Sequence, residues 1–121
     1  MNNNCISNIL ETILLLQEQR STNGIGCTKE ILGETSETAN TRPINIYTCC
    51  NNAIWTMPYD YQGATGESTF FRIESINNNT ATFRILINTA GVYTATDNFF
   101  IIDLDCVSCI KCLKDTLITT I

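Results

Sequence analysis

The sequence predicts a mostly β, single-domain protein, a β-sandwich or jelly-roll-like barrel preceded by one N-terminal helix. Three observations lead to this fold class. The chain has 121 residues, which is enough for one domain and too few for two. It is 44% hydrophobic and only 16% charged, and it is rich in Thr and Asn, which favour strands and turns. Its apolar pattern changes from a helical period near the N-terminus to a period of two after Pro43.

The N-terminal segment, residues 1–20, is predicted to hold a helix over residues 6–19. Ser7 or Asn8 is a suitable cap, with Glu11 three residues after Asn8 in the position of a capping box. We expect this helix to pack on the domain. The alternative is that it binds a partner. The apolar positions recur at helical spacing and are Ile6, Ile9, Leu10, Ile13, Leu14 and Leu16.

Residues 21–42 are predicted to be irregular because they are rich in Gly, Ser, Thr and Asn. They contain Cys27 and the sequence GIG, which is too short for a phosphate-binding loop. We therefore interpret GIG as a turn.

Residues 43–105 are predicted to form the β core. In FFRIESI, Phe71 and Ile73 share one face of a strand. A hairpin is expected around 77–79, because Asn tolerates positive φ. Arg72, Glu74 and Arg84 are then expected on the outer faces, where opposite charges pair across strands. Two further strands, GVYTAT and NFFIIDLD, are predicted to join near 97–98, and residues 106–121 form a Cys-rich C-terminal segment.

The charge balance bears on possible partners. The formal net charge is −5, the pI is about 4.5, and the seven basic residues are scattered, which argues against nucleic acid as a partner. No apolar run is long enough to span a membrane, so no membrane partner is expected. The first twenty residues lack a basic region before their apolar stretch, so no secretory signal peptide is predicted.

The sequence contains no histidine, which removes the usual general base and every Ser/His or Cys/His nucleophile pair. Asp103 and Asp105 are two residues apart and would share a face of a strand, but such pairs are common at solvated strand ends. We expect no catalytic residues and no enzymatic activity.

Seven cysteines are many for a chain without an export signal, and their odd number leaves at least one without an internal disulfide partner. A metal site is one alternative: the C-x2-C-x2-C pattern at Cys106, Cys109 and Cys112 would need a fourth ligand from elsewhere. We expect no metal and no cofactor, because no paired CxxC is present elsewhere in the chain.

Cross-linking between chains is the other alternative. Cys49 and Cys50 are neighbours, so on a strand one thiol faces outward. The spacing of the tail cysteines also turns successive thiols to different sides of an extended chain. A third alternative is that individual cysteines are buried in the core as reduced thiols. The candidate cross-linking residues are Cys5, Cys27, Cys49, Cys50, Cys106, Cys109 and Cys112.

Four segments stand in order along nearly the whole chain: NCISN (4–8), NTRPINIYT (40–48), FFRIESI (70–76) with a turn and RIL after it, and IDLDCVSCIKCLKD (102–115). Together they resemble the spore coat protein Y/Z family of Bacillus-type endospore formers, which includes cysteine-rich proteins of the exosporium basal layer. The cysteines that match this resemblance are Cys5, Cys27, Cys106, Cys109 and Cys112, whereas Cys49 and Cys50 follow the matched IYT.

This resemblance implies a structural protein of the spore surface, coat or exosporium, made in the mother-cell cytoplasm without a signal peptide. It implies self-assembly into a hexameric or higher-order lattice that disulfides make durable, with other coat or exosporium proteins as further partners. The chain lacks the His- and Cys-rich N-terminal extension of some members and its middle is shorter. A minor coat component, an adaptor for another surface component and a filament-forming relative are therefore alternatives.

Overall fold

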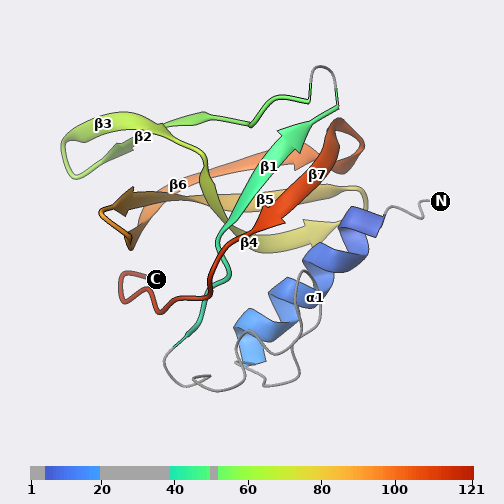
Figure 1. Cartoon of the computed structure of the whole chain (residues 1–121), viewed down its shortest axis with the longest axis horizontal. Coiled ribbons are helices and arrows are strands. Elements are labelled where there is room, and N and C mark those ends of the chain that lie inside the picture. Colours follow the sequence, from blue (N-terminus) through green and yellow to red (C-terminus); the bar gives the residue numbers. More distant parts are fainter. Residues whose placement is uncertain (1–4, 20–38, 50–51) are drawn as a thin grey trace.

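The computed structural model describes residues 5–19, 39–49 and 52–121, which form a mostly β fold with an N-terminal helix (Figure 1). The predicted fold class is confirmed, since the strands lie in two sheets in a sandwich-like arrangement. The elements are α1 (Cys5–Gln19), β1 (Ile44–Thr48), β2 (Met57–Tyr61), β3 (Ala64–Ser68), β4 (Phe70–Asn77), β5 (Thr80–Thr89), β6 (Val92–Asp103), the 3₁₀ helix η2 (Leu104–Cys106) and β7 (Val107–Cys112).

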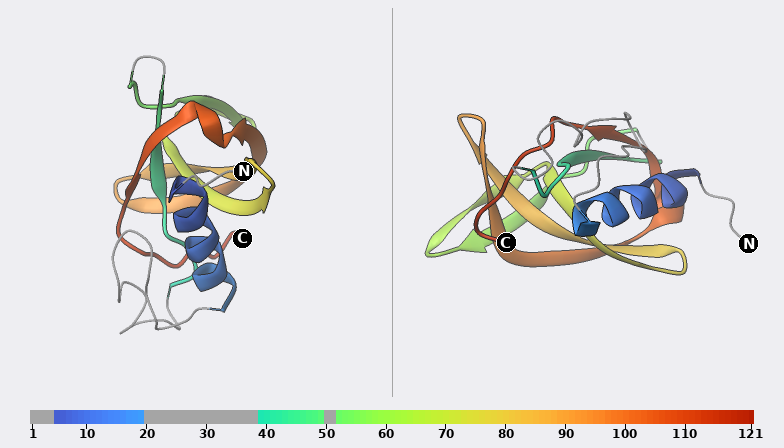
Figure 2. Two further views of the ribbon diagram at one scale, coloured as in Figure 1. Left: turned by 90° about the vertical axis from the view of Figure 1, so that its right-hand side faces the viewer. Right: turned by 90° about the horizontal axis from the view of Figure 1, so that it is seen from below.

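The larger sheet has five antiparallel strands in the order β6-β5-β4-β1-β7, and β2 and β3 form a separate hairpin. Its two parts, β4–β5–β6 and β1–β7, are joined where Ile44 pairs with Phe71. Figure 2 shows α1 lying between these two parts. The helix therefore fills the space that opens where β1 diverges from β4.

The hydrophobic core lies between α1 and the inner face of the larger sheet. Leu10 and Ile13 of α1 are fully buried against Phe71 and Phe83. The Phe100 ring lies edge-on to Phe71 with a centroid distance of 4.9 Å and stacks on Phe83 at 5.5 Å. The expected pairing of Phe71 with Ile73 on one face of a strand is confirmed, because both are buried in this core.

The helix matches the predicted segment but begins earlier. It starts at Cys5, so Ser7 and Asn8 lie inside it and the predicted cap is wrong. The Thr12 hydroxyl donates to the Asn8 carbonyl at 3.1 Å, which is a bond within the helix. Gln17 is buried as well, although its polar side chain lies outside the predicted apolar stripe.

The predicted hairpin at 77–79 joins β4 to β5, and Asn78 takes the expected positive φ of 58°. The predicted charge pairing is also present: one Glu74 oxygen accepts from Arg72 at 2.8 Å and from Arg84 at 3.0 Å. Arg72 is nonetheless buried, because its guanidinium also donates to Thr41 and to the Asn40 carbonyl.

Two strand predictions need correction. The strands expected on either side of 97–98 are one continuous strand, β6. Asn98 does not form a turn, because its amide bonds to the backbone N and O of Asp60 and thereby attaches β2 to β6. The Cys-rich segment contributes a further strand, β7, that the sequence analysis did not predict.

Candidate functional site

Three exposed cysteines lie at one end of the β1–β7 pair: Cys49, Cys106 and Cys109, which we call the thiol end. The Cys49 amide donates to the Cys106 carbonyl at 2.8 Å. The Cys49 thiol donates to the Asp105 carbonyl at 3.2 Å. The thiol end thus joins residues that are far apart in the sequence.

Strand pairing fixes the backbone of this end. Cys109 lies opposite Tyr47 on β1, and the register shifts by one residue between Tyr47 and Thr48. The Ser108 hydroxyl lies 3.2 Å from both the Tyr47 and Thr48 carbonyls and 3.1 Å from the Asn52 side-chain oxygen. The Cys109 thiol is therefore presented to solvent from a strand with a defined register.

Cys112 has a different environment from the other tail cysteines. It is half-buried, packs against the hydrophobic core and is disulfide-bonded. Cys112 therefore differs from Cys106 and Cys109, and the predicted cross-linking role of these three residues stays a prediction. The Cys5 side chain, Cys27 and Cys50 lie outside the residues that the structure describes, so their predicted cross-linking roles stay predictions.

Metal binding was the alternative for these cysteines. Within residues 5–19, 39–49 and 52–121, no three Cys, Asp or Glu side chains are grouped so that they could hold a metal ion. The sequence places Cys27 and Cys50 outside these ranges, so the expectation of no metal stays a prediction.

Asp103 and Asp105 do not form the pair that their spacing suggested. Asp105 lies in η2 rather than on a strand, so the two do not share a strand face. One Asp103 oxygen accepts from the Asp105 amide and from the Asn79 side chain, both at 3.0 Å. Asp103 thus caps the short helix that turns the chain from β6 into β7.

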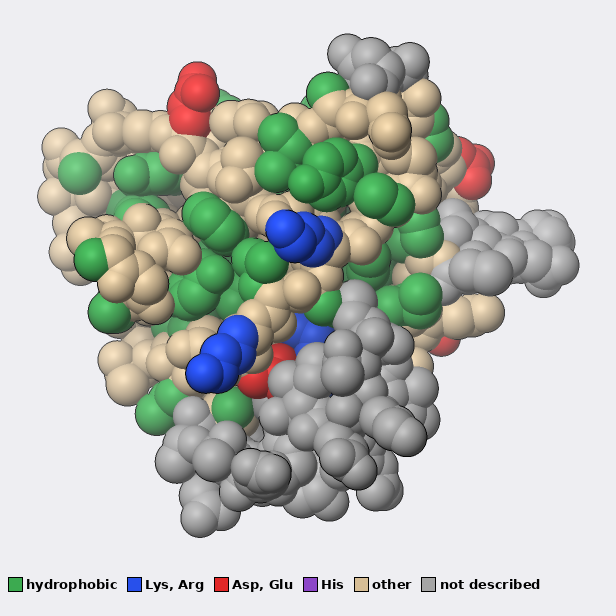
Figure 3. All heavy atoms as spheres, viewed as in Figure 1, with side chains coloured by type: hydrophobic (Ala, Val, Ile, Leu, Met, Phe, Trp, Pro, Cys, Tyr) green, Lys and Arg blue, Asp and Glu red, His purple; other side chains and the backbone are tan. Residues whose placement is uncertain are grey.

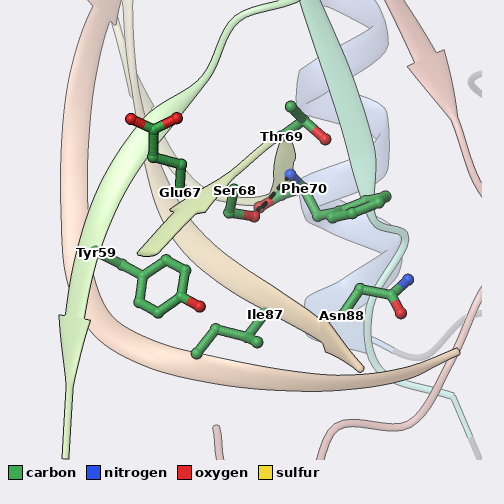
Figure 4. A pocket seen from close by; sticks show the side chains of 7 residues that line it. All are labelled: Tyr59, Glu67, Ser68, Thr69, Phe70, Ile87 and Asn88. Atoms are coloured by element: carbon green, nitrogen blue, oxygen red, sulfur yellow. Dashed lines mark hydrogen bonds between the residues drawn. The ribbon is translucent and has the colours of Figure 1, made fainter. Parts of the chain in front are cut away.

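A small hollow of about 160 Å³ lies between the β2–β3 hairpin and β5 (Figure 4). Its lining mixes polar and apolar side chains, and the Glu67 carboxylate points away from the Tyr59 ring. The Ser68 hydroxyl is engaged, since it donates to the Leu86 carbonyl and accepts from the Phe70 amide at 3.0 Å. The Ser68 hydroxyl is therefore used within the fold.

A second polar cluster, which the sequence analysis missed, ties residues 40–42 to residues 115–118; we call it the polar clasp. Arg42 is 1% exposed, and its guanidinium bonds to Asp115 at 3.0 Å. The Asn40 side chain exchanges two bonds of 3.0 Å with the Ile118 backbone. The Gln17 side-chain oxygen accepts from the Arg42 amide at 3.1 Å, which connects the clasp to α1.

The position of Asp115 in the polar clasp raises the pKa of its carboxyl group. Burial raises its pKa above the usual value, whereas the hydrogen bond from Arg42 and the Arg42 charge lower it in part. The cost of burying the carboxylate thus outweighs the attraction of the guanidinium.

The surface carries no concentration of basic charge on the face shown in Figure 3. The blue Lys and Arg side chains there stand apart: hydrophobic side chains lie beside the upper one, and a red acidic side chain lies beside the lower ones. Among the described residues, no helix is long and apolar enough to cross a membrane.

Comparison with known proteins gives a family for most of this chain. The model of the family described as spore coat protein Z matches residues 1–94 of the 121. The match covers three of the four quoted segments and ends before IDLDCVSCIKCLKD, so the tail cysteines lie beyond it. No curated protein and no solved structure matched the chain. Since the family match covers most of its length, the chain belongs to the spore coat protein Z family, whose members have a structural role at the spore surface.

Proposed function

We propose that this spore coat protein assembles with copies of itself into an ordered polymer, and that disulfides from the thiol end cross-link the copies. The observation that carries this proposal is the exposure of Cys49 and Cys109 on a strand pair of fixed register. The family supports a structural role, and the exposed thiols supply a means of joining one subunit to the next.

The geometry of a disulfide favours this use of Cys109. The Cα atoms of the two bonded cysteines must lie about 4.4–6.8 Å apart. Each cysteine that joins two chains must therefore lie at a surface that the other chain can approach. An exposed thiol on a strand meets this condition without unfolding. The reaction joins two thiols and releases two protons and two electrons, which oxygen or a small disulfide can accept.

Cross-links would make the polymer durable in a kinetic sense. A subunit held by covalent bonds cannot leave the polymer alone, even when its noncovalent contacts open. This property suits a layer that must withstand heat and denaturants. The polymer can be a hexameric lattice, a ring or a filament, depending on whether its contacts close.

The rest of the proposal follows from the sequence. We infer no enzymatic activity, because the chain has no histidine and Asp103 is used as a helix cap. Other coat or exosporium proteins are the expected further partners. Nucleic acid is not expected, given the net charge of −5 and the scattered basic residues. A membrane is not expected either, because no apolar run is long enough to span one. From the family resemblance we also infer synthesis in the mother-cell cytoplasm.

Electron microscopy of the purified protein with and without reductant tests this function. We expect ordered objects that resist heat and denaturant only when oxidised, and a Cys49→Ser/Cys109→Ser variant that assembles but loses this resistance. Ser75→Ala, also at an exposed strand position, is the control and should keep it. Featureless monomers in both conditions, or a cysteine variant as resistant as the parent, would contradict the proposal.

A further inference from the structure

The outer face of β6 carries an apolar pair between two acidic residues. Along the strand, Asp97, Phe99, Ile101 and Asp103 are exposed. Of the residues between them, Phe100 and Ile102 pack in the core, and Asn98 bonds to Asp60 of β2. Phe99 is 48% exposed and Ile101 is 69% exposed. We call these four residues the β6 strip.

β6 is an edge strand, and in the described ranges its first part makes contacts with other segments that its second part lacks. Within the described residues it pairs along its length only with β5. Its first part is covered, because Thr120 accepts from the Ala95 amide at 2.8 Å and Asn98 holds Asp60 of β2. The strip's apolar pair lies beyond these contacts, and adjacent exposed apolar residues on an edge strand mark an interaction surface.

The strip is held in a defined shape before any partner arrives. The Arg84 guanidinium lies 4.6 Å from the centre of the Phe99 ring. Arg84 is itself fixed by Glu74 at 3.0 Å and by the Thr96 carbonyl at 3.0 Å. Arg84 and Phe99 are paired across β5 and β6, and the guanidinium covers one face of the ring. The ring is thus held in place, which lowers the entropic cost of docking a partner on it.

Charge indicates what the partner is. The strip ends in Asp97 and Asp103, so it favours a surface that combines apolar and basic groups. Such a surface exists on this chain: Lys111 and Lys114 are exposed on and just after β7, and Leu117, three residues after Lys114, is 43% exposed. β7 is the opposite edge strand of the same sheet.

We propose that the β6 strip of one copy docks on the Lys111–Lys114 face of a second copy. This inference rests on the proposed function that copies assemble, and it names the noncovalent contact that brings them together. Cys109 lies two residues before Lys111 on the same strand, so the contact places an exposed thiol beside the interface.

An apolar variant tests the strip under reducing conditions, where no disulfide holds the copies. Phe99→Ser/Ile101→Ser is expected to raise the concentration for half-assembly at least tenfold in light scattering. The matched control is Val92→Ser, because Val92 lies on the same strand, is 67% exposed and is remote from the strip's apolar pair. The control is expected to stay within twofold of the parent, and circular dichroism checks that each variant is folded.

Charge exchange tests the identity of the partner face without altering the apolar pair. Asp97→Lys/Asp105→Lys reverses acidic charges at and near the strip, and Lys111→Glu/Lys114→Glu reverses the basic face. Each double variant is expected to raise the concentration for half-assembly about tenfold. Combining all four substitutions is expected to recover most of the loss. Raised salt is expected to weaken the parental contact as well.

The outcomes separate this inference from the proposed function. If the parent assembles and the strip variants assemble equally well, the inference is overturned and the proposed function stands. Val92→Ser weakening assembly as strongly as the strip variant, or charge variants that fail to rescue each other, also overturns the inference. A parent that stays monomeric at every concentration overturns both.

Discussion

The two ends of the β1–β7 pair are built on opposite principles. At one end, the polar clasp buries Arg42 and Asp115 and joins them to α1 through Gln17. At the other end, Cys49 and Cys109 stand in solvent. The same two strands therefore carry a buried polar network at one end and exposed thiols at the other.

This difference separates stability from reactivity along a short stretch of chain. A buried charge network is sensitive to any change in its members, since each lost partner leaves another group unsatisfied. An exposed cysteine on a paired strand contributes little to folding and can be replaced or oxidised without disturbing the core. Substitutions at the two ends should consequently have opposite effects on folding and on cross-linking.

The largest effect is expected at Arg42. Arg42→Met keeps much of the side-chain volume but leaves the Asp115 carboxylate buried without its cation. We expect the free energy of unfolding to fall by about 3–5 kcal/mol. Denaturant unfolding measures this change.

Lys114→Met is the matched control, because it removes a positive charge next to Asp115 from an exposed position. Its effect should stay within about 0.5 kcal/mol. Equal losses for the two variants would mean that the clasp does not hold the strand pair together.

An intermediate effect is expected at Cys112, three residues from Cys109 on the same strand. Cys112→Ser removes a disulfide and places a hydroxyl against the core, so we expect a loss of about 2–4 kcal/mol. Cys109→Ser should cost less than about 0.5 kcal/mol but reduce cross-linked species on a non-reducing gel. If Cys109→Ser destabilises the fold as much as Cys112→Ser does, the separation of the two ends is wrong.

The smallest effect is a dependence on pH. Because burial raises the native pKa of Asp115, the folded chain keeps this proton at pH values where the unfolded chain has released it. The free energy of unfolding therefore falls as pH rises through a window that begins near the usual value of 3.8. Asp115→Asn removes this titration, so the stability of the variant relative to the parent should increase as pH increases.

Unfolding at several pH values above and below this window measures the effect, with Asp97→Asn as an exposed control for the loss of one carboxyl. The control should run parallel to the parent. A parent that gains stability over Asp115→Asn with rising pH would show that the Arg42 charge outweighs the cost of burial.

Local patterns in the sequence predicted much of the sheet. Alternation placed Phe71 and Ile73 in the core, and the Asn-rich stretch at 77–79 predicted the β4–β5 hairpin. Glu74 pairs with Arg72 on its own strand and with Arg84 across the hairpin. These features depend on residues close together in the chain, which is why the pattern was sufficient.

Features that depend on distant residues were missed. Pro58 in β2 and Gly66 in β3 are unfavourable residues inside a strand, so the β2–β3 hairpin was not predicted. The pair 97–98 has turn-forming residues, yet a bond to Asp60 keeps it in β6. Most of the clasp joins residues more than 70 positions apart, and the sequence alone gives no sign of such pairs.

The connectivity of β7 has a consequence for the time course of folding. The β4–β5–β6 strands are joined by short turns, whereas β7 must find β1, whose residue Thr48 is 60 positions from Ser108. Closing so long a loop costs entropy, so we expect β7 to be placed after the neighbouring strands have formed. In a newly made chain Cys109 and Cys112 thus share one environment, and they acquire different reactivities only in the last step, when β7 pairs with β1.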